Sequence, residues 1–273
     1  MARYGMIIDA TTCLGCNACT VACIEENQTA YWGDKVRTRV YEKEVGSYPD
    51  TDRIFQTQIC VHCDDPPCVD VCPTGASHIG PGGVVLVDYE KCILCGACVE
   101  VCPYDARYFY TPQDVQKARE EYGPDNEHFV PHVDKCTLCI HRIEQGLEPA
   151  CVATCVGESR IFVDWDNLTP EQEALAKKAV PLFKGSDYSN IFRGNFDPKP
   201  KIRYIIDKEN AVPKKKVGVG VWLWHYLAKP LGLLSIAGIL GVLGLNYIIT
   251  KPQVKKIKEQ LEEMKSEEKN KEE

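Results

Sequence analysis

Sixteen cysteines at short, regular spacings are the residues of this chain best suited to chemistry. Cys92, Cys95 and Cys98 are separated by two residues each, and Cys102 follows three residues later with Pro103 behind it. This spacing is the bacterial ferredoxin run for a [4Fe-4S] cluster, because a cubane needs several thiolates that converge from one short loop. A zinc knuckle is the alternative, but it usually divides its thiolates between two distant Cys-x-x-Cys pairs. The run therefore predicts an iron-sulfur cluster.

The remaining cysteines repeat this pattern. The four groups span residues 13–23, 60–72, 92–102 and 136–155, contain four cysteines each and leave none over. Eight disulfides would also use an even number of cysteines, but short gaps in succession suit a metal centre better than separate bridges. Four clusters with four cysteines each have no open iron site. The pattern thus predicts single-electron transfer through four [4Fe-4S] clusters and not substrate binding at iron.

The segments around the groups predict an α+β fold in residues 1–165. Short apolar or strand-like segments precede each group. Residues 54–110 repeat a strand, a cysteine loop and a Gly-rich turn, which predicts an inner ferredoxin-like module. The first and fourth groups, within residues 4–53 and 111–165, predict the halves of an outer module wrapped around it. We therefore expect two interleaved ferredoxin-like modules with loop insertions.

The assignment of cysteines to clusters follows from the same ferredoxin pattern. In two-cluster ferredoxins the fourth cysteine of each run ligates the other cluster. The predicted ligand sets are Cys13, Cys16, Cys19 and Cys155 for cluster 1; Cys60, Cys63, Cys68 and Cys102 for cluster 2; Cys92, Cys95, Cys98 and Cys72 for cluster 3; and Cys136, Cys139, Cys151 and Cys23 for cluster 4. The alternative, in which each run closes its own cluster, stays open.

A membrane anchor is predicted in the last part of the chain. Residues 166–221 are expected to form an extension with an amphipathic surface helix and a lysine-flanked extended arm. From Leu231 to Ile249 there are nineteen uncharged, mostly apolar residues, which as a helix nearly cover a hydrocarbon layer of about 30 Å. With its aromatic flanks this predicts one transmembrane helix within residues 222–250, followed by a charged tail over residues 251–273.

Charge and motif content exclude other functions. The net charge of −7 argues against a nucleic acid partner. The N-terminus has no apolar signal region and no twin arginine. No nucleotide loop or catalytic triad accompanies the cysteines, so the chain is expected to be non-catalytic. His62, inside the second group, is expected to form hydrogen bonds near a cluster and not to ligate iron.

The four groups resemble a known family. The second group reads CxxCxxxxCxxxCP, the third is followed by PYDAR, and the fourth contains KCTLC and EPACVATC. Over about residues 4–165 the chain resembles the four-cluster iron-sulfur subunit of membrane-bound molybdopterin oxidoreductases, such as dimethyl sulfoxide, polysulfide, thiosulfate and tetrathionate reductases and formate dehydrogenase. The chain lacks the proline that the family often has after the last cysteine of the fourth group, which puts no ligand in doubt.

The resemblance implies partners and a location. It implies a molybdopterin-type catalytic subunit on one side, and an integral membrane subunit that binds quinone or haem on the other. It also implies attachment to the prokaryotic cytoplasmic membrane and its lipid, with the iron-sulfur domain on the extracytoplasmic face. The alternative is a membrane-anchored ferredoxin-like relay for a hydrogenase or another redox partner. A zinc-stabilised membrane scaffold without a redox role is a third hypothesis.

Overall fold

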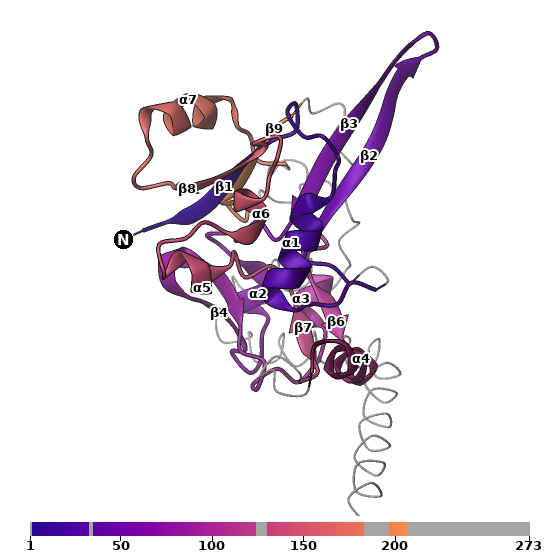
Figure 1. Ribbon diagram of the computed structural model, residues 1–273. Coiled ribbons are helices and arrows are strands. Elements are labelled where there is room, and N and C mark those ends of the chain that lie inside the picture. Colours follow the sequence, from indigo (N-terminus) through magenta and orange to yellow (C-terminus); the bar gives the residue numbers. More distant parts are fainter. Residues whose placement is uncertain (1, 33–34, 124–129, 183–196, 207–273) are drawn as a thin grey trace, which may run out of the picture.

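Each cysteine group lies between a strand that leads into it and a strand that follows it. The structure is a computed structural model, which describes residues 2–32, 35–123, 130–182 and 197–206 (Figure 1). The leading strands are β1 (Tyr4–Asp9), β3 (Asp50–Ile59), β5 (Val85–Val87) and β7 (His132–Asp134). The following strands are β2 (Thr38–Ser47), β4 (Ser77–Ile79), β6 (Tyr108–Tyr110) and β8 (Arg160–Asp164). The predicted strands before the four groups are confirmed.

The strand pairing closes these segments into a ring. The strand after each of the first three groups pairs antiparallel with the strand before the next group, giving the pairs β2-β3, β4-β5 and β6-β7. The strand after the fourth group, β8, returns to the beginning of the chain and pairs antiparallel with β1, where Ile161 lies opposite Ile7. The last cysteine group is thereby brought next to the first.

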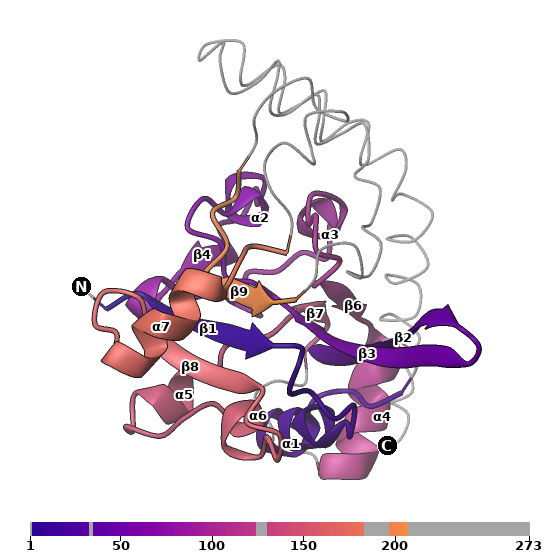
Figure 2. The ribbon, with the colours of Figure 1, turned by 90° about the horizontal axis from the view of Figure 1, so that it is seen from above.

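Helices that begin within the cysteine runs also pack in pairs. They are α1 (Ala18–Asn27), α2 (Pro67–Asp70), α3 (Ala97–Glu100) and α6 (Ala150–Ala153). Helix α1 packs against α6, and α2 packs against α3, as Figure 2 shows. The first group therefore lies with the fourth and the second with the third. The predicted ferredoxin-like fold with mixed helices and strands is confirmed.

The segment predicted as an extended arm is a strand of the core. Strand β9 (Ile202–Ile205) pairs parallel with β1, so that the order in this sheet is β8-β1-β9. Ile202 and Tyr204 are fully buried. Helix α7 (Pro170–Lys178), predicted from the sequence as a surface helix, has no fully buried residue. The segment is extended, as expected, but it completes the sheet that carries the first cysteine group.

Two further elements extend from this body. The hairpin of β2 and β3 projects from it (Figure 1), and its tip is the turn at Tyr48 and Pro49. Residues 114–122, DVQKAREEY, have a helical sequence pattern, and helix α4 (Pro112–Tyr122) confirms it. The remaining short helices are α5 (Ile140–Ile143) and the 3-10 turn η1 (Pro81–Gly83).

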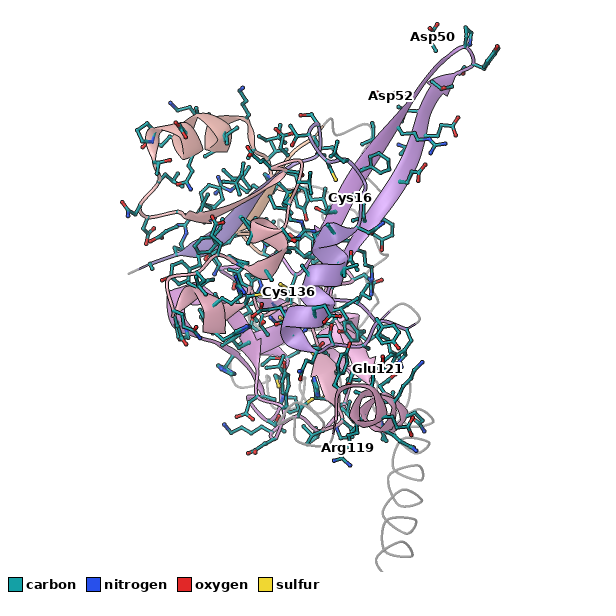
Figure 3. The ribbon with its side chains drawn as sticks, viewed as in Figure 1. Cys16, Asp50, Asp52, Arg119, Glu121 and Cys136 are labelled. Atoms are coloured by element: carbon teal, nitrogen blue, oxygen red, sulfur yellow. The ribbon has the colours of Figure 1, made fainter. Side chains whose placement is uncertain are left out.

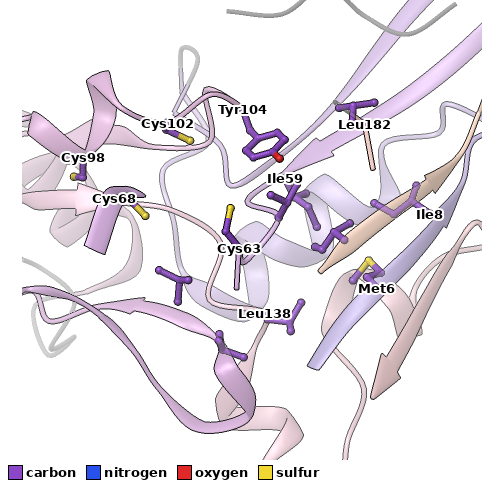
Figure 4. Close-up of a cluster of buried hydrophobic side chains, with 14 of the residues drawn as sticks. Met6, Ile8, Ile59, Cys63, Cys68, Cys98, Cys102, Tyr104, Leu138 and Leu182 are labelled. Atoms are coloured by element: carbon purple, nitrogen blue, oxygen red, sulfur yellow. The ribbon is translucent and has the colours of Figure 1, made fainter. Parts of the chain in front are cut away.

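The main core contains thiols as well as aliphatic side chains. Met6, Ile8, Ile59 and Leu138 pack in one cluster with buried cysteines from all four groups. Figure 4 shows part of this cluster, with cysteines of the second and third groups. Within the described ranges, no helix has the length and apolar character needed to cross a membrane. The predicted span at residues 222–250 and the charged tail at 251–273 lie outside the described residues.

Candidate metal centres

One cavity brings the first cysteine run together with the end of the fourth. It is lined by the three thiols of Cys13, Cys16 and Cys19 and by Cys155, with Arg160 on its wall. The chain separates these residues by more than a hundred positions, and the pairing of β8 with β1 joins them. All four residues predicted for cluster 1 therefore surround one space.

A second cavity brings together the four residues predicted for cluster 4. Cys23, Cys136, Cys139 and Cys151 line it. The side chain of Asn27 also lines it, and its Nδ2 atom lies 3.7 Å from the sulfurs of both Cys23 and Cys139. The last thiol of the first run thus faces the thiols of the fourth run.

The last thiol of the second run and the last thiol of the third run each lie near thiols of the other run. Cys63 lies close enough to interact electrostatically with Cys60, Cys68 and Cys102, the other residues predicted for cluster 2. Cys95 interacts in the same way with Cys92 and Cys72, two of the residues predicted for cluster 3. The predicted crossed sets are therefore spatial neighbours, and their joint ligation of a cluster stays a prediction.

Left-handed residues fold the loops between the cysteines. Gly15 has φ 68° and Gly96 has φ 75°, a conformation that glycine adopts without the steric cost of a Cβ. A Cβ on Gly15 would lie 2.4 Å from the Phe55 ring, and one on Gly96 would lie 2.7 Å from the Phe109 ring. Both glycines therefore let an aromatic side chain close over the loop that carries the thiols.

The buried thiols are poor acids without a positive partner. Burial raises the pKa of Cys102 and of Cys136 to about 12 each, and it raises the pKa of Cys63 well above the ordinary value. Backbone N-H groups offset a part of this cost: Ala106 donates to the Cys102 sulfur at 3.4 Å, and Leu138 donates to the Cys136 sulfur at 3.3 Å. Thiolates in these positions require a metal or another cation nearby.

Buried cations next to the thiols fit an anionic group. Arg160 is 3% exposed; its Nη2 donates to Thr38 at 2.6 Å, while Nε and Nη1 are buried without a hydrogen-bond partner beside the cavity of Cys13 to Cys155. A buried guanidinium without a carboxylate partner is costly, so it indicates an anionic acceptor in that cavity. Among the described residues, no three His, Cys, Asp or Glu side chains are placed to hold a single metal ion. The donor set fits an anionic cluster with four thiolate ligands.

His62 offers another unpaired donor. Its ring is fully buried, and Nδ1 accepts a hydrogen bond from the Val85 N-H at 3.2 Å. Burial and the nearby cations Lys135, Lys201 and Arg107 hold the pKa of His62 well below its usual value, so the ring is neutral. The proton is then on Nε2, which is buried without a partner. This geometry supports the predicted hydrogen-bonding role, which stays a prediction.

We call the four cysteines predicted for clusters 1 to 4 sets 1 to 4. The exposure of the cysteines divides these sets into two classes. Every cysteine of sets 2 and 4 is buried, whereas Cys16 of set 1 is exposed and Cys72, Cys92 and Cys95 of set 3 are half-buried. Figure 3 shows the difference between Cys16, in the loop before α1, and Cys136 in the interior. Exposed apolar side chains lie next to cysteines of sets 1 and 3. They are Leu14 and Val156 for set 1 and Ile93 for set 3.

Three buried cations that face these thiols were not predicted from the sequence. Arg107, Lys135 and Arg160 are each at most 3% exposed. A lysine or arginine is normally a surface residue, so composition gives no warning of this burial. Position in the repeat is the signal that was available: Arg107 and Arg160 each follow the last cysteine of a run by five residues, and Lys135 precedes Cys136.

Comparison with known proteins agrees with this geometry. Two family models match, both described as a 4Fe-4S dicluster domain, over residues 12–76 and residues 51–165. The overlap of the two matches covers the second cysteine group. Iron-sulfur cluster binding is thus the property shared by both matched families.

Several whole proteins are also similar to this chain. The B subunit of tetrathionate reductase from Salmonella typhimurium is 40% identical over 203 residues, which are 74% of this chain and 72% of the relative. The B subunit of polysulfide reductase from Wolinella succinogenes is 38% identical over 215 residues, 77% of this chain and 97% of the relative. The B subunit of sulfite dehydrogenase from Allochromatium vinosum is 34% identical over 229 residues, which are 77% of this chain and 88% of the relative. The chain therefore belongs to the family of iron-sulfur B subunits that includes these proteins.

Proposed function

We propose that this chain relays single electrons through four [4Fe-4S] clusters, as a non-catalytic subunit of a respiratory oxidoreductase complex. A [4Fe-4S] cluster, when bound, supplies one-electron transfer at a potential set by burial, charge and hydrogen bonds. The four crossed cysteine sets are its proposed ligands. The loops hold the thiols, and the surrounding core excludes water from sets 2 and 4, whose cysteines are all buried.

The exposure of the cysteines is the observation that carries this proposal. A relay needs insulated centres in the middle and accessible centres at its ends. Sets 2 and 4 consist of buried cysteines only, and sets 1 and 3 contain exposed or half-buried ones. An enzyme that used a cluster at a substrate site would instead need an incompletely ligated iron, and each set offers four thiols.

Electrostatic interactions between thiols of different sets support one order along the relay. Cys19 of set 1 interacts electrostatically with Cys151 of set 4, and Cys136 of set 4 with Cys60 of set 2. Cys98 of set 3 interacts with Cys68 of set 2. These neighbours support a row with the order 1, 4, 2, 3, which places the two accessible sets at opposite ends.

The two ends imply two redox partners. The relatives are B subunits of named reductases and a dehydrogenase, which supports a separate catalytic subunit as one partner. We infer that this partner is of the molybdopterin type, and that an integral membrane subunit with quinone or haem is the other. The apolar residues around both ends, such as Leu14 and Ile93, suit such contacts.

Membrane attachment is part of the same proposal. Residues 222–250 are proposed to span the prokaryotic cytoplasmic membrane once, in contact with lipid, with the iron-sulfur domain on the extracytoplasmic face. Truncation before Trp222 should leave the clusters intact, because every candidate ligand precedes residue 156. The truncated chain should appear in the soluble fraction when its partners are absent. Loss of iron from the soluble truncated form would contradict a purely anchoring role.

Isolation of the complex tests the proposed function. A tag on this chain should recover a large subunit that contains molybdenum or tungsten, together with an integral membrane subunit. Metal analysis and mass spectrometry identify both. A chain that is recovered alone under gentle anaerobic conditions, with zinc in place of iron, would contradict the proposal.

A further inference from the structure

Three buried cations lie where neighbouring cysteine sets meet. We call Arg160, Lys135 and Arg107 the gap cations. Arg160 interacts electrostatically with Cys19 of set 1 and Cys151 of set 4. Lys135 lies between sets 4 and 2, and Arg107 lies between sets 2 and 3, the next two pairs of neighbours in the proposed row. Each gap between successive sets thus contains one gap cation.

Arg107 joins sets 2 and 3. Its Nη2 donates to the Cys68 sulfur at 3.1 Å, and its Nη1 donates to Ser77 at 2.9 Å. It also interacts electrostatically with Cys98 of set 3. The guanidinium is therefore fixed by a hydrogen bond to one set while its charge acts on both.

Lys135 joins sets 4 and 2. The residue is 1% exposed, and its Nζ donates to the carbonyl oxygens of Val85 and, at 2.7 Å, Cys136. Its charge interacts with Cys136 of set 4 and with Cys60 and Cys68 of set 2. These carbonyl contacts hold the ammonium in place but do not neutralise it.

Other buried cations in this protein are paired with carboxylates. Arg37 forms an ion pair with Asp134 at 2.9 Å, and Lys201 has Asp64 within 3.3 Å. In the part of the chain that the structure describes, none of the gap cations forms such an ion pair. A buried charge without a counter-ion is strongly unfavourable, so the gap cations require anions at the cysteine sets.

We propose that each gap cation raises the midpoint potentials of the two clusters on either side of it. The inference rests on the proposed four-cluster relay. Reduction adds one electron to a cluster and makes it more negative, and a fixed positive charge nearby stabilises that reduced form. Because each cation lies between two clusters, it raises both of their midpoint potentials. The difference in potential between successive clusters therefore stays small, which limits unfavourable electron-transfer steps along the row.

Charge-removing variants test this in the full-length, cluster-loaded chain. The variants are Arg160→Met, Lys135→Met and Arg107→Met, and the readout is an anaerobic redox titration followed by EPR. Each variant should reduce the equilibrium constant for reduction of two clusters by about tenfold, which is about 59 mV for a one-electron couple. Lys135→Met should share one affected cluster with each of the other variants, and those two should share none.

Two controls separate charge from packing. Lys201→Met removes a lysine that is equally buried, donates to a backbone carbonyl and has a carboxylate partner. It should leave the four potentials near their original values. Arg107→Lys keeps the charge and should retain potentials that Arg107→Met loses. If Arg107→Met loses iron, Arg107→Gln, which can still bond to Ser77, provides the same comparison.

The outcomes distinguish the two proposals. Four unchanged midpoint potentials in the iron-replete variants, or a shift that Lys201→Met reproduces in full, would overturn the role of the gap cations and leave the relay intact. A shift confined to one cluster would also overturn the shared action. Absence of four [4Fe-4S] signals from the unmodified chain would instead overturn the proposed relay itself.

Discussion

The interior around the cysteine loops differs from the small apolar cluster beneath α4. In the first, buried thiols pack among the aliphatic side chains, and cations that form no ion pair with a carboxylate of the described residues face them. In the second, Ala30, Tyr110 and Val115 pack together, and the buried carboxylate of Asp114 beside them has hydrogen-bond partners within the protein. The buried charged groups of the first interior need a bound metal cluster as their partner, whereas the buried carboxylate of the second is paired within the protein.

Polar groups in the α4 cluster are paired with each other. Asp114 accepts hydrogen bonds from Trp32 Nε1 at 2.7 Å and from Lys35 at 2.5 Å. It also accepts from the Thr111 N-H at 2.7 Å, which completes a capping box at the start of α4. The comparison teaches that burial of polar atoms is tolerated in two ways, by protein partners or by a cofactor.

Iron removal should have the largest effect. Because the binding free energy of the clusters is folding free energy in such a core, we expect the chain to lose most of its native structure when iron is chelated anaerobically. Far-UV circular dichroism during chelation measures this. Reconstitution with ferrous iron and sulfide serves as the control for irreversible damage. A native-like spectrum without iron would mean that the thiol interior stabilises itself.

Loss of single thiols should reveal which runs share a cluster. Cys102→Ser should alter the same EPR signal as Cys63→Ser, because both residues belong to set 2. It should not alter the signal that Cys95→Ser affects. Cys72→Ser is the matched test and should behave like Cys95→Ser. If Cys102→Ser and Cys95→Ser damage one common centre, each run closes its own cluster and the crossed assignment is wrong.

Helix caps should have a smaller effect, restricted to the cofactor-independent region. Thr111→Ala removes the N-cap of α4 and should cost about 1 kcal/mol of local stability. Hydrogen exchange of the α4 amides measures this. Thr169→Ala removes an equivalent capping box from α7, where Gln172 N-H donates to Thr169 at 3.2 Å. That control should leave α4 protection unchanged, and equal effects of both variants on α4 would contradict a local role.

Acid should weaken the α4 cluster through Asp114. Burial alone would raise the pKa of Asp114, but hydrogen bonds from Lys35, Thr111 and Trp32 outweigh it and hold the pKa below 3.8. A carboxyl with a lowered pKa in the folded state contributes stability that is present above its unfolded pKa and is lost as pH falls through the folded value. Exchange protection of α4 should fall in that acidic range in the wild type and less steeply in Asp114→Asn. Identical pH profiles would contradict this.

Elements that follow from short local sequence patterns were predicted correctly. Contacts between segments that lie far apart in the sequence were not. The strands before the cysteine groups and helix α4 follow from short patterns, so they were predictable. Strand β9 was interpreted as an arm because lysines flank it, yet Lys201 is buried with its Nζ against Gly83 and Asp64. Its partner β1 lies almost two hundred residues earlier, and no local pattern encodes that pairing.

The gap cations were unpredictable for a related reason. Arg107 stands in the quoted PYDAR segment and Lys135 before Cys136, but a charge in a sequence does not indicate what surrounds it. Their burial results from packing between runs that lie far apart in the chain. By contrast, the sixteen candidate ligands were visible at once, because cysteine spacing is itself the local geometry of a cluster loop.

Metal content combined with EPR is the most direct test of the central claim. We predict about sixteen irons per full-length chain, with matching acid-labile sulfide, from four [4Fe-4S] clusters. The dithionite-reduced protein should show several interacting S = 1/2 signals. About eight irons would limit the relay to two clusters. Zinc with no EPR signal from the reduced protein would contradict the account altogether.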